Sequence, residues 1–390
     1  MSNSTKEKKE IRIQEDLANR KKITFKSILK NPLLLPICAL IVVVILSAII
    51  TKIKNDANFF SLNIKNVALD GQPAKKVLYG SIMDILNRSS ELIILAVGMT
   101  LVVASSKGTD ISVGSVMAIS GAIIVRLLGE SYESYAILPV FAILAGICSG
   151  IACGAFNGFL VSKLKIQPMV ATLILFTAGR GIAQLISSRP IPGTNEYSTG
   201  VILYVRKESF QWIGNFLPNS IIPTPIFIAI IFVLLVFLFL RFTAFSTYIK
   251  SVGINEKASK LVGINSTFII FICYVICGIA SSVAGLIASS RIYSSDANNI
   301  GLNMELDAIL AVALGGNSLG GGKFTIAGSV IGAITIQALS TSLYSIGVPA
   351  AQLPVYKAVV VILIVLFQSP VFKSSIERFK ARRAIKLQGE

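Results

Sequence analysis

The stretch TPIFIAIIFVLLVFLFL, Thr224 to Leu240, contains no charged residue and decides the class of fold. At about 1.5 Å per residue, a helix of this length crosses most of the hydrocarbon core of a bilayer. A strand of a membrane β-barrel would alternate apolar and polar residues, whereas this run is apolar throughout. Leu33 to Ile50 is a second such run. Only a helix satisfies the backbone of an isolated apolar span, so the sequence predicts an all-α, polytopic integral membrane protein.

The composition of the chain agrees with a membrane protein and excludes several functions. The 390 residues are 54% hydrophobic and 14% charged, and the mean hydropathy is +0.76. The net charge of +17 comes from basic residues at the chain ends and in short loops, which argues against a nucleic-acid-binding domain. The chain has no histidine, which excludes histidine metal sites and histidine-assisted nucleophiles. Without clustered carboxylates either, the sequence predicts neither an enzyme nor a cofactor.

About ten transmembrane helices are predicted. A tail (1–32) precedes a membrane domain (33–370), and a second basic tail (371–390) follows it. Ten crossings put both termini on one side, and the basic loops place that side in the cytoplasm. Short or broken helices are predicted near 92–110 and 306–323, and losing both weak spans would leave eight. The predicted spans are 33–50, 92–105, 112–128, 135–161, 168–186, 225–242, 267–290, 306–317, 324–344 and 354–367.

The chain contains two glycine patterns, a regular four-residue spacing and a glycine-rich segment. Gly146 to Gly158 recur at every fourth position, a ridge that favours close helix packing over a substrate-lining role. GGNSLGGGKF, from Gly315 to Phe324, is not a nucleotide-binding P-loop, because Asn317 and Phe324 occupy positions that need glycine and a hydroxyl residue. The better interpretation is a break between two membrane helices, where irregular backbone must be surrounded by protein or water.

The segment KGTDISVGS, Lys107 to Ser115, places an aspartate just before the N-terminus of a predicted helix. Asp110 is suited to accept hydrogen bonds from free N–H groups there, with Ser112 sharing the role. Intramembrane ionisable residues also commonly belong to a transport pathway. Both interpretations stay open, and the helix cap is favoured.

A basic loop, about 243–266, is predicted to be cytoplasmic. Its core, VGINEKASKLVGIN, pairs Glu256 with Lys260 at helical spacing and predicts a short amphipathic helix. Such a helix either connects two spans or docks a soluble partner, and composition does not separate the two.

Three blocks together resemble a known family: GMTLVVASSKGTDISVGSVMAISGA, VGINEKASKLVGIN and LDAILAVALGGNSLGGGKFTIAGSVIGAI. They are similar to the membrane subunits of bacterial ABC importers for monosaccharides, the ribose/xylose/galactose permease family. The resemblance covers Asn87 to Gln368. NFFSL, SSDANNIGLNMELDAILAV and VFKSSIE resemble the galactofuranose-type branch most.

The resemblance implies a permease in the bacterial inner membrane for a galactofuranose-, galactose- or ribose-like sugar. A second permease subunit, identical or a sibling, would complete the pathway. Two ABC ATPase subunits would hydrolyse ATP, and an extracellular sugar-binding protein would deliver the substrate.

Site residues follow from the same resemblance. In the ATPase-coupling segment, the expected contact face comprises Gly253, Asn255, Glu256, Ala258 and Gly263. Residues matching the family's translocation or gating block are Asp110, Ser112 and Gly114, and Asn317 in the glycine-rich break is assigned to the same role. Lys107 and Thr109 depart from the family's usual glycine and isoleucine.

Other functions stay open from sequence alone. The same architecture serves nucleosides or branched-chain amino acids. An ion-coupled secondary transporter would need carboxylates in mid-helix, and Glu91 and Asp307 are predicted near segment ends.

Overall fold

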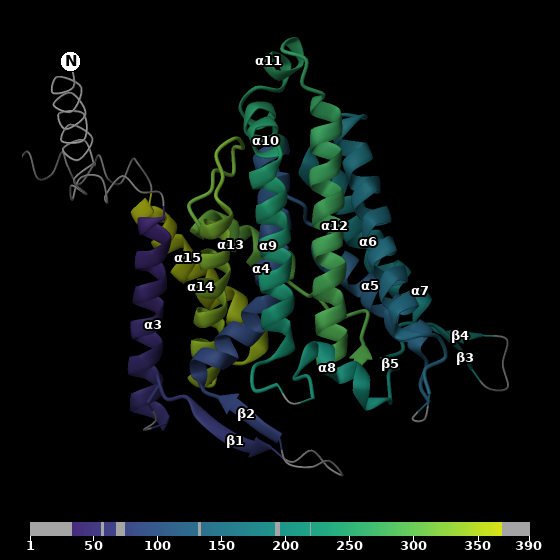
Figure 1. Cartoon of the computed structure of the whole chain (residues 1–390), viewed down its shortest axis with the longest axis vertical. Helices are drawn as coiled ribbons and strands as arrows, with labels where there is room; N and C mark the ends of the chain where they lie inside the picture. Colours follow the sequence, from purple (N-terminus) through teal and green to yellow (C-terminus); the bar gives the residue numbers. More distant parts are fainter. Residues whose placement is uncertain are drawn as a thin grey trace, which may run out of the picture.

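A computed structural model describes residues 33–55, 58–67, 75–131, 134–191, 196–218 and 220–368. The predicted tails, 1–32 and 371–390, lie outside these residues. The described chain is mostly helical (Figure 1). Its α-helices are α3 (Leu34–Asn55), α4 (Ser81–Ser106), α5 (Val113–Leu128), α6 (Pro139–Ser162), α7 (Pro168–Ile186), α8 (Gln211–Gly214), α9 (Thr224–Phe242), α10 (Phe245–Ile254), α11 (Glu256–Leu261), α12 (Ser266–Arg291), α13 (Met304–Leu314), α14 (Ile326–Ser345) and α15 (Leu353–Gln368).

Within the described ranges, seven helices are long and apolar enough to cross a membrane: α3, α4, α6, α7, α9, α12 and α14. Shorter apolar helices lie over Val113–Leu128 and Ala350–Ile362, and α13 has only 11 residues. Each of the ten predicted spans therefore contains a helix. The chain is a multi-pass membrane protein.

The predicted weak second span is in fact the long helix α4. It has 26 residues and starts at Ser81, eleven positions before the predicted start, so the expectation of a short helix at 92–105 is wrong. Hydropathy misses its first half because Asp84, Arg88 and Glu91 are charged. The second half of α4 is central, since its residues from Ser89 to Ser105 are buried except for Glu91, which pairs with Arg291. Asp84 and Arg88 lie nearer the start of the helix, where Arg88 is exposed and Asp84 is partly exposed. The break begins only after α4, at Lys107.

The prediction of an all-α chain overlooks short strands outside the helical bundle. β1 (Asn63–Val67) and β2 (Lys75–Tyr79) form an antiparallel pair. Two-residue pairs join β3 (Arg189–Pro190) to β4 (Tyr197–Ser198) and β5 (Leu203–Tyr204) to β6 (Ser294–Ser295). In Figure 1 the β1–β2 pair and α8 lie at the end of the bundle opposite α11. Open strand edges are acceptable there because water satisfies them. Two 3₁₀ turns, η1 (Glu208–Phe210) and η2 (Ala350–Gln352), complete the secondary structure.

The glycine ridge on α6 packs against α12. A Cβ on Gly150 would overlap Gly278 and Ser282, and one on Gly154 would overlap the backbone of Tyr274. The two helices therefore approach at backbone distance, as small-residue ridges allow. The packing interpretation of this ridge is confirmed.

Candidate functional site

Two non-helical segments interrupt the helical bundle, and the polar residues of the candidate site lie in or beside them. The first interruption, Lys107–Ser112, separates α4 from α5. The second interruption, Gly315–Thr325, separates α13 from α14. The starts of α5 and α13 meet inside the protein: a Cβ on Gly114 would overlap the carbonyl oxygen of Gly301 and a carboxylate oxygen of Glu305. Glycine at 114 is thus required for the contact between the two short helices.

Two backbone N–H groups in the first interruption donate to side chains instead of to helical carbonyl oxygens. The N–H of Lys107 donates to the Val103 carbonyl oxygen (3.2 Å), with φ of 59° closing α4 in the left-handed conformation. The N–H of Asp110 donates to the Met99 Sδ (3.3 Å), and that of Ile111 to the Thr172 Oγ1 (3.1 Å). Side chains of α4 and α7 therefore replace the missing helical partners, as irregular backbone at membrane depth requires.

Asp110 organises the turn before α5. Its Oδ1 accepts from both the N–H (2.9 Å) and the Oγ (2.6 Å) of Ser112, and that Oγ accepts from the Asn157 Nδ2 (2.8 Å). Asp110 is 3% exposed. Among the described residues, the buried Thr109 Oγ1 and Asn157 Oδ1 have no hydrogen-bond partner. The first interruption therefore holds both a fixed polar network and buried polar atoms with unused hydrogen-bonding capacity.

Asn317 plays the equivalent part in the second interruption. Its Nδ2 donates to the Ser329 Oγ (2.7 Å) and the Val312 carbonyl oxygen (3.3 Å), while its Oδ1 accepts from the Thr325 N–H (2.7 Å). One amide thus ties the end of α13 to the start of α14. Because Asn317 is buried, each of these bonds is shielded from water.

Asn317→Ala should lower the free energy of unfolding by about 2 kcal/mol, because it removes three hydrogen bonds at a buried position and leaves the Thr325 N–H without an acceptor. Hydrogen exchange should also speed up at the Thr325 amide, which loses its acceptor. Thermal unfolding in detergent and exchange mass spectrometry measure both effects. The control is Ser318→Ala at the exposed neighbouring position, with an expected change within about 0.5 kcal/mol. Equal effects at 317 and 318 would contradict the assigned network.

The two interruptions meet the base of the loop 243–266, which we call the coupling loop after the role that the sequence resemblance predicts for it. The Lys107 Nζ donates to the Ile254 carbonyl oxygen (3.0 Å), and the Gly322 N–H donates to the Ala104 carbonyl oxygen (2.9 Å). A Cβ on Gly253 would overlap the Ala104 carbonyl oxygen and crowd Gly322. The ends of α4, α10 and the second interruption therefore share one contact.

The coupling loop contains two helices rather than one. The predicted amphipathic helix is α11, with the expected Glu256–Lys260 ion pair (3.1 Å). The Asn255 Oδ1 accepts from the Ala258 N–H (3.1 Å) and caps its start. α10, which the sequence did not predict, packs on α4 and α12 through the buried face Phe245, Ile249, Val252 and Gly253. Figure 1 shows α11 projecting beyond the other helices at one end of the bundle.

The expected contact face divides into exposed and buried members. Asn255, Ala258 and Gly263 are exposed and Glu256 is partly exposed, whereas Gly253 is buried in the packing described above. Two apolar neighbours that the sequence analysis did not single out, Leu261 and Val262, are 89% and 76% exposed. The sequence alone could have indicated these two residues, because they are apolar and precede a glycine in a basic loop. Exposed apolar residues grouped on a projecting helix are typical of a protein-docking surface.

Glu256 holds the coupling loop to the rest of the protein. Its Oε1 lies 2.5 Å from the Lys165 Nζ and accepts from the Ser266 Oγ (3.1 Å). Burial raises the pKa of Glu256, but hydrogen bonds from Lys165 and Lys260 outweigh it and lower the pKa to about 2. The carboxylate is therefore ionised at physiological pH and links α11 to the segment after α6.

Glu256→Gln should lower stability at pH 7 by about 1 kcal/mol or less, because this half-exposed ion pair is screened by solvent. The folded-state pKa lies below the ordinary 4.5, so the contribution is complete above pH 4.5 and disappears as the pH falls towards 2. Unfolding of both proteins in detergent from pH 7 to pH 2.5 measures the difference. A gap that widens with acidification would contradict this assignment.

Two carboxylates within the bundle are paired with cations. Glu91 lies 3.1 Å from the Nη1 of Arg291, and Asp307 lies 2.7 Å from the Nζ of Lys357. Glu91 sits within α4, not near a segment end as predicted, because α4 starts earlier. Both carboxylates are thus neutralised by a neighbouring cation.

Comparison with known proteins shows similarity to membrane permeases. Residues 81–368 match the family described as branched-chain amino acid transport system / permease component. The chain is 42% identical over 307 residues to the galactofuranose transporter permease protein YtfT of Escherichia coli K12, covering 78% of this chain and 84% of the relative. It is 37% identical to the fructose import permease protein FruF of Bifidobacterium longum, with 80% and 84% coverage. It is 35% identical to the ribose import permease protein RbsC of Escherichia coli K12, with 84% and 92% coverage.

No solved structure shows significant similarity to the chain. The family resemblance seen in the three sequence blocks is confirmed, since relatives named as sugar permeases cover most of the chain. The chain therefore belongs to the branched-chain amino acid transport system / permease component family, as a multi-pass membrane permease.

Proposed function

We propose that the chain is the permease subunit of an ABC importer and forms the translocation pathway for a monosaccharide. The observation that carries this proposal is the 42% identity to a galactofuranose permease, supported by fructose and ribose permeases at 37% and 35%. A galactofuranose-, galactose- or ribose-like sugar is the substrate class. The permease itself is not catalytic, and ATP hydrolysis takes place on partner subunits.

The proposed assembly has two permease subunits, two ATPase subunits and an extracellular sugar-binding protein. Ten crossings of the membrane domain, 33–370, place both tails and the coupling loop in the cytoplasm. Asn255, Glu256, Ala258 and Gly263 then face the ATPase, together with Leu261 and Val262. The exposure of these residues supports their role as the ATPase contact surface. Gly253 is buried, so we propose that it belongs to the base of the coupling loop and not to that surface.

The contacts at the base of the coupling loop suggest how ATP drives the pathway. Closure of the ATPase subunits displaces α11 and, through α10, the contacts of Lys107 and Gly322. Those contacts belong to the two interruptions, so both respond to a single displacement. ATP thereby shifts the population between two access states by binding one of them preferentially. Asp110, Ser112, Gly114 and Asn317 belong to the pathway or its gate.

Two other functions receive less support. An ion-coupled transporter needs a carboxylate free to bind a cation or proton, and the two candidates considered from sequence, Glu91 and Asp307, are held in ion pairs. The buried Glu305 has an oxygen without a partner among the described residues, so the main argument against this function is the similarity to named sugar import permeases. Transport of branched-chain amino acids has one argument in its favour, the description of the matching family. The named sugar permeases outweigh it, because their identity extends over most of both chains.

Substrate class is tested on the cognate extracellular binding protein by titration calorimetry. Galactofuranose, galactose, ribose and fructose are compared with uridine, leucine and isoleucine. The proposal expects binding of one or more of the sugars and none of the others. Binding of a nucleoside or amino acid without any sugar would overturn the substrate class.

A further inference from the structure

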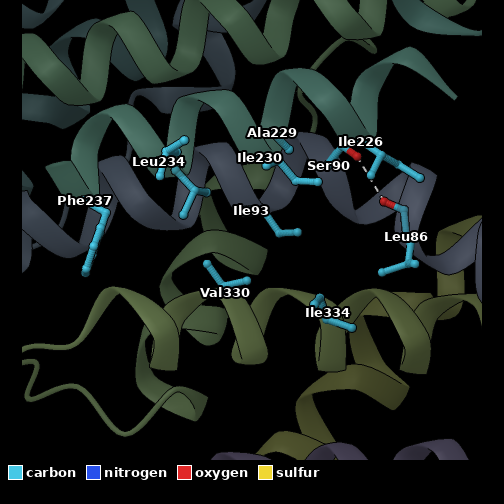
Figure 2. Close-up of a pocket in the computed structure, with 11 residues that line it drawn as sticks. Leu86, Ser90, Ile93, Ile226, Ala229, Ile230, Leu234, Phe237, Val330 and Ile334 are labelled. Atoms are coloured by element: carbon cyan, nitrogen blue, oxygen red, sulfur yellow. Dashed lines mark hydrogen bonds between the residues drawn. The ribbon is translucent and has the colours of Figure 1, made fainter. Parts of the chain in front are cut away.

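An apolar groove runs between α9 and α14, with α4 as its floor. Its deep part is a hollow of about 450 Å³ lined by apolar atoms. Figure 2 shows Ile93 of α4 lying between Ile230 of α9 and Val330 of α14. The one hydroxyl in the lining, on Ser90, is turned to the Leu86 carbonyl oxygen of its own helix (3.0 Å). Nothing in this part attracts water or a sugar.

The groove continues towards the coupling loop and changes character there. A second hollow of about 810 Å³ shares Val233, Phe237 and Val330 with the first. Its far end is polar and basic. The polar side chains that line it are Arg241, Thr243, Ser246, Thr247 and Thr325.

Arg241 is the charged group at the polar end of the groove. Its side chain is exposed, and in the described part of the chain it takes part in no ion pair or hydrogen bond. An arginine facing a membrane groove without a carboxylate partner is suited to bind a phosphate group, which its planar guanidinium recognises through two N–H groups. Ser246 and Thr247 add hydroxyl donors beside it.

We infer that this groove binds one anionic phospholipid from the leaflet on the coupling-loop side. The acyl chain lies along the apolar part, and the phosphate binds Arg241. From Arg241 to Ile226 the groove follows α9 for about 22 Å, which is longer than the about 15 Å depth of one leaflet's hydrocarbon. With the phosphate at Arg241, the acyl chain occupies the part of the groove nearer to Arg241.

The groove is apolar along most of its length and basic at one end, and this distribution favours a lipid over other occupants. A second copy of the chain would bury an apolar face, but it would not call for an unpaired arginine at one end. An anionic lipid satisfies both parts of the groove at once. The groove also lies beside α10, so its occupant contacts the first part of the coupling loop.

Mass spectrometry of the intact permease released from detergent tests the headgroup contact. The protein is reconstituted with phosphatidylglycerol in excess phosphatidylcholine before analysis. Wild type should retain one phosphatidylglycerol per chain. Arg241→Gln should weaken its binding about fivefold, the factor one basic residue supplies at an anionic membrane. The matched control is Lys163→Gln, another exposed cation, with unchanged binding expected. Equal retention in all three proteins would overturn the inference.

Fluorescence quenching tests the position of the acyl chain. Trp212 is replaced by Phe, and a single Trp is placed at Leu234 in the groove or at Leu235 outside it; both positions are exposed, at 50% and 61%. Brominated phosphatidylglycerol should quench the Trp at 234 at about fivefold lower mole fraction than the Trp at 235, and Arg241→Gln should remove the difference. Identical curves would overturn the inference. So would a Trp at 234 that no brominated lipid quenches, since protein would then cover the groove.

Discussion

Asp110→Ala is expected to abolish sugar uptake and to lower the free energy of unfolding by about 3 kcal/mol. The substitution removes the oxygen that accepts both hydrogen bonds from Ser112 and thereby loosens the contact of Ser112 with Asn157. Buried donors left without acceptors cost about 1–3 kcal/mol each. Uptake by proteoliposomes and thermal unfolding in detergent measure the two effects.

Two further variants separate hydrogen bonding from charge at this position. Asp110→Asn keeps the accepting oxygen and should keep near-normal stability and at least half of the uptake. Ser149→Ala removes one hydroxyl bonded locally within α6 (2.6 Å to the Gly146 carbonyl oxygen) and should change stability by about 0.5 kcal/mol or less. If Asp110→Asn were as inactive as Asp110→Ala, the negative charge rather than the turn would be the essential feature.

Gly253→Ala is expected to lower stability by about 2 kcal/mol and to uncouple ATP hydrolysis from uptake. The added Cβ overlaps the backbone of Ala104 and lies against Gly322, so α10 must move away from both. That movement separates the coupling loop from the two interruptions. The measurements are thermal unfolding, together with ATPase activity and uptake of the reconstituted complex.

Gly181→Ala is the matched control for this prediction. Gly181 lies in α7, and a Cβ there would meet nothing within 4 Å. The variant should be neutral or up to about 1 kcal/mol more stable, because alanine favours a helix. Normal coupling of ATP hydrolysis to uptake in Gly253→Ala would mean that the contacts at the base of the coupling loop do not link the ATPase to the two interruptions.

Hydropathy predicted the helices that face lipid and undervalued those that face protein. α9 is exposed and apolar as far as Arg241, and its predicted and observed limits agree within a residue. α4 has a buried apolar half and a first half that carries Asp84, the exposed Arg88 and the ion-paired Glu91, and this charged half was missed. The short strands escaped prediction because their pairing partners lie outside any repeating pattern, as in the β5–β6 pair between distant loops.

The interruptions themselves were predictable, but their meeting point was not. Glycines at 315–322 and the KGTD turn marked places where a helix ends. That Lys107 reaches Ile254, and that Gly253 packs on Ala104, depends on tertiary contacts between positions about 150 residues apart. The left-handed conformation of Lys107 is one that glycine, the residue expected there from the sequence resemblance, adopts without strain.

ATP-dependent sugar uptake is the most direct test of the proposed transport function. The permease is reconstituted with its ATPase subunits in proteoliposomes, and the loaded binding protein is added on the side opposite the ATPase. Uptake of labelled sugar should require ATP on the ATPase side and should be unaffected by ionophores that collapse proton and sodium gradients. Uptake without ATP that those ionophores abolish would contradict the proposed function.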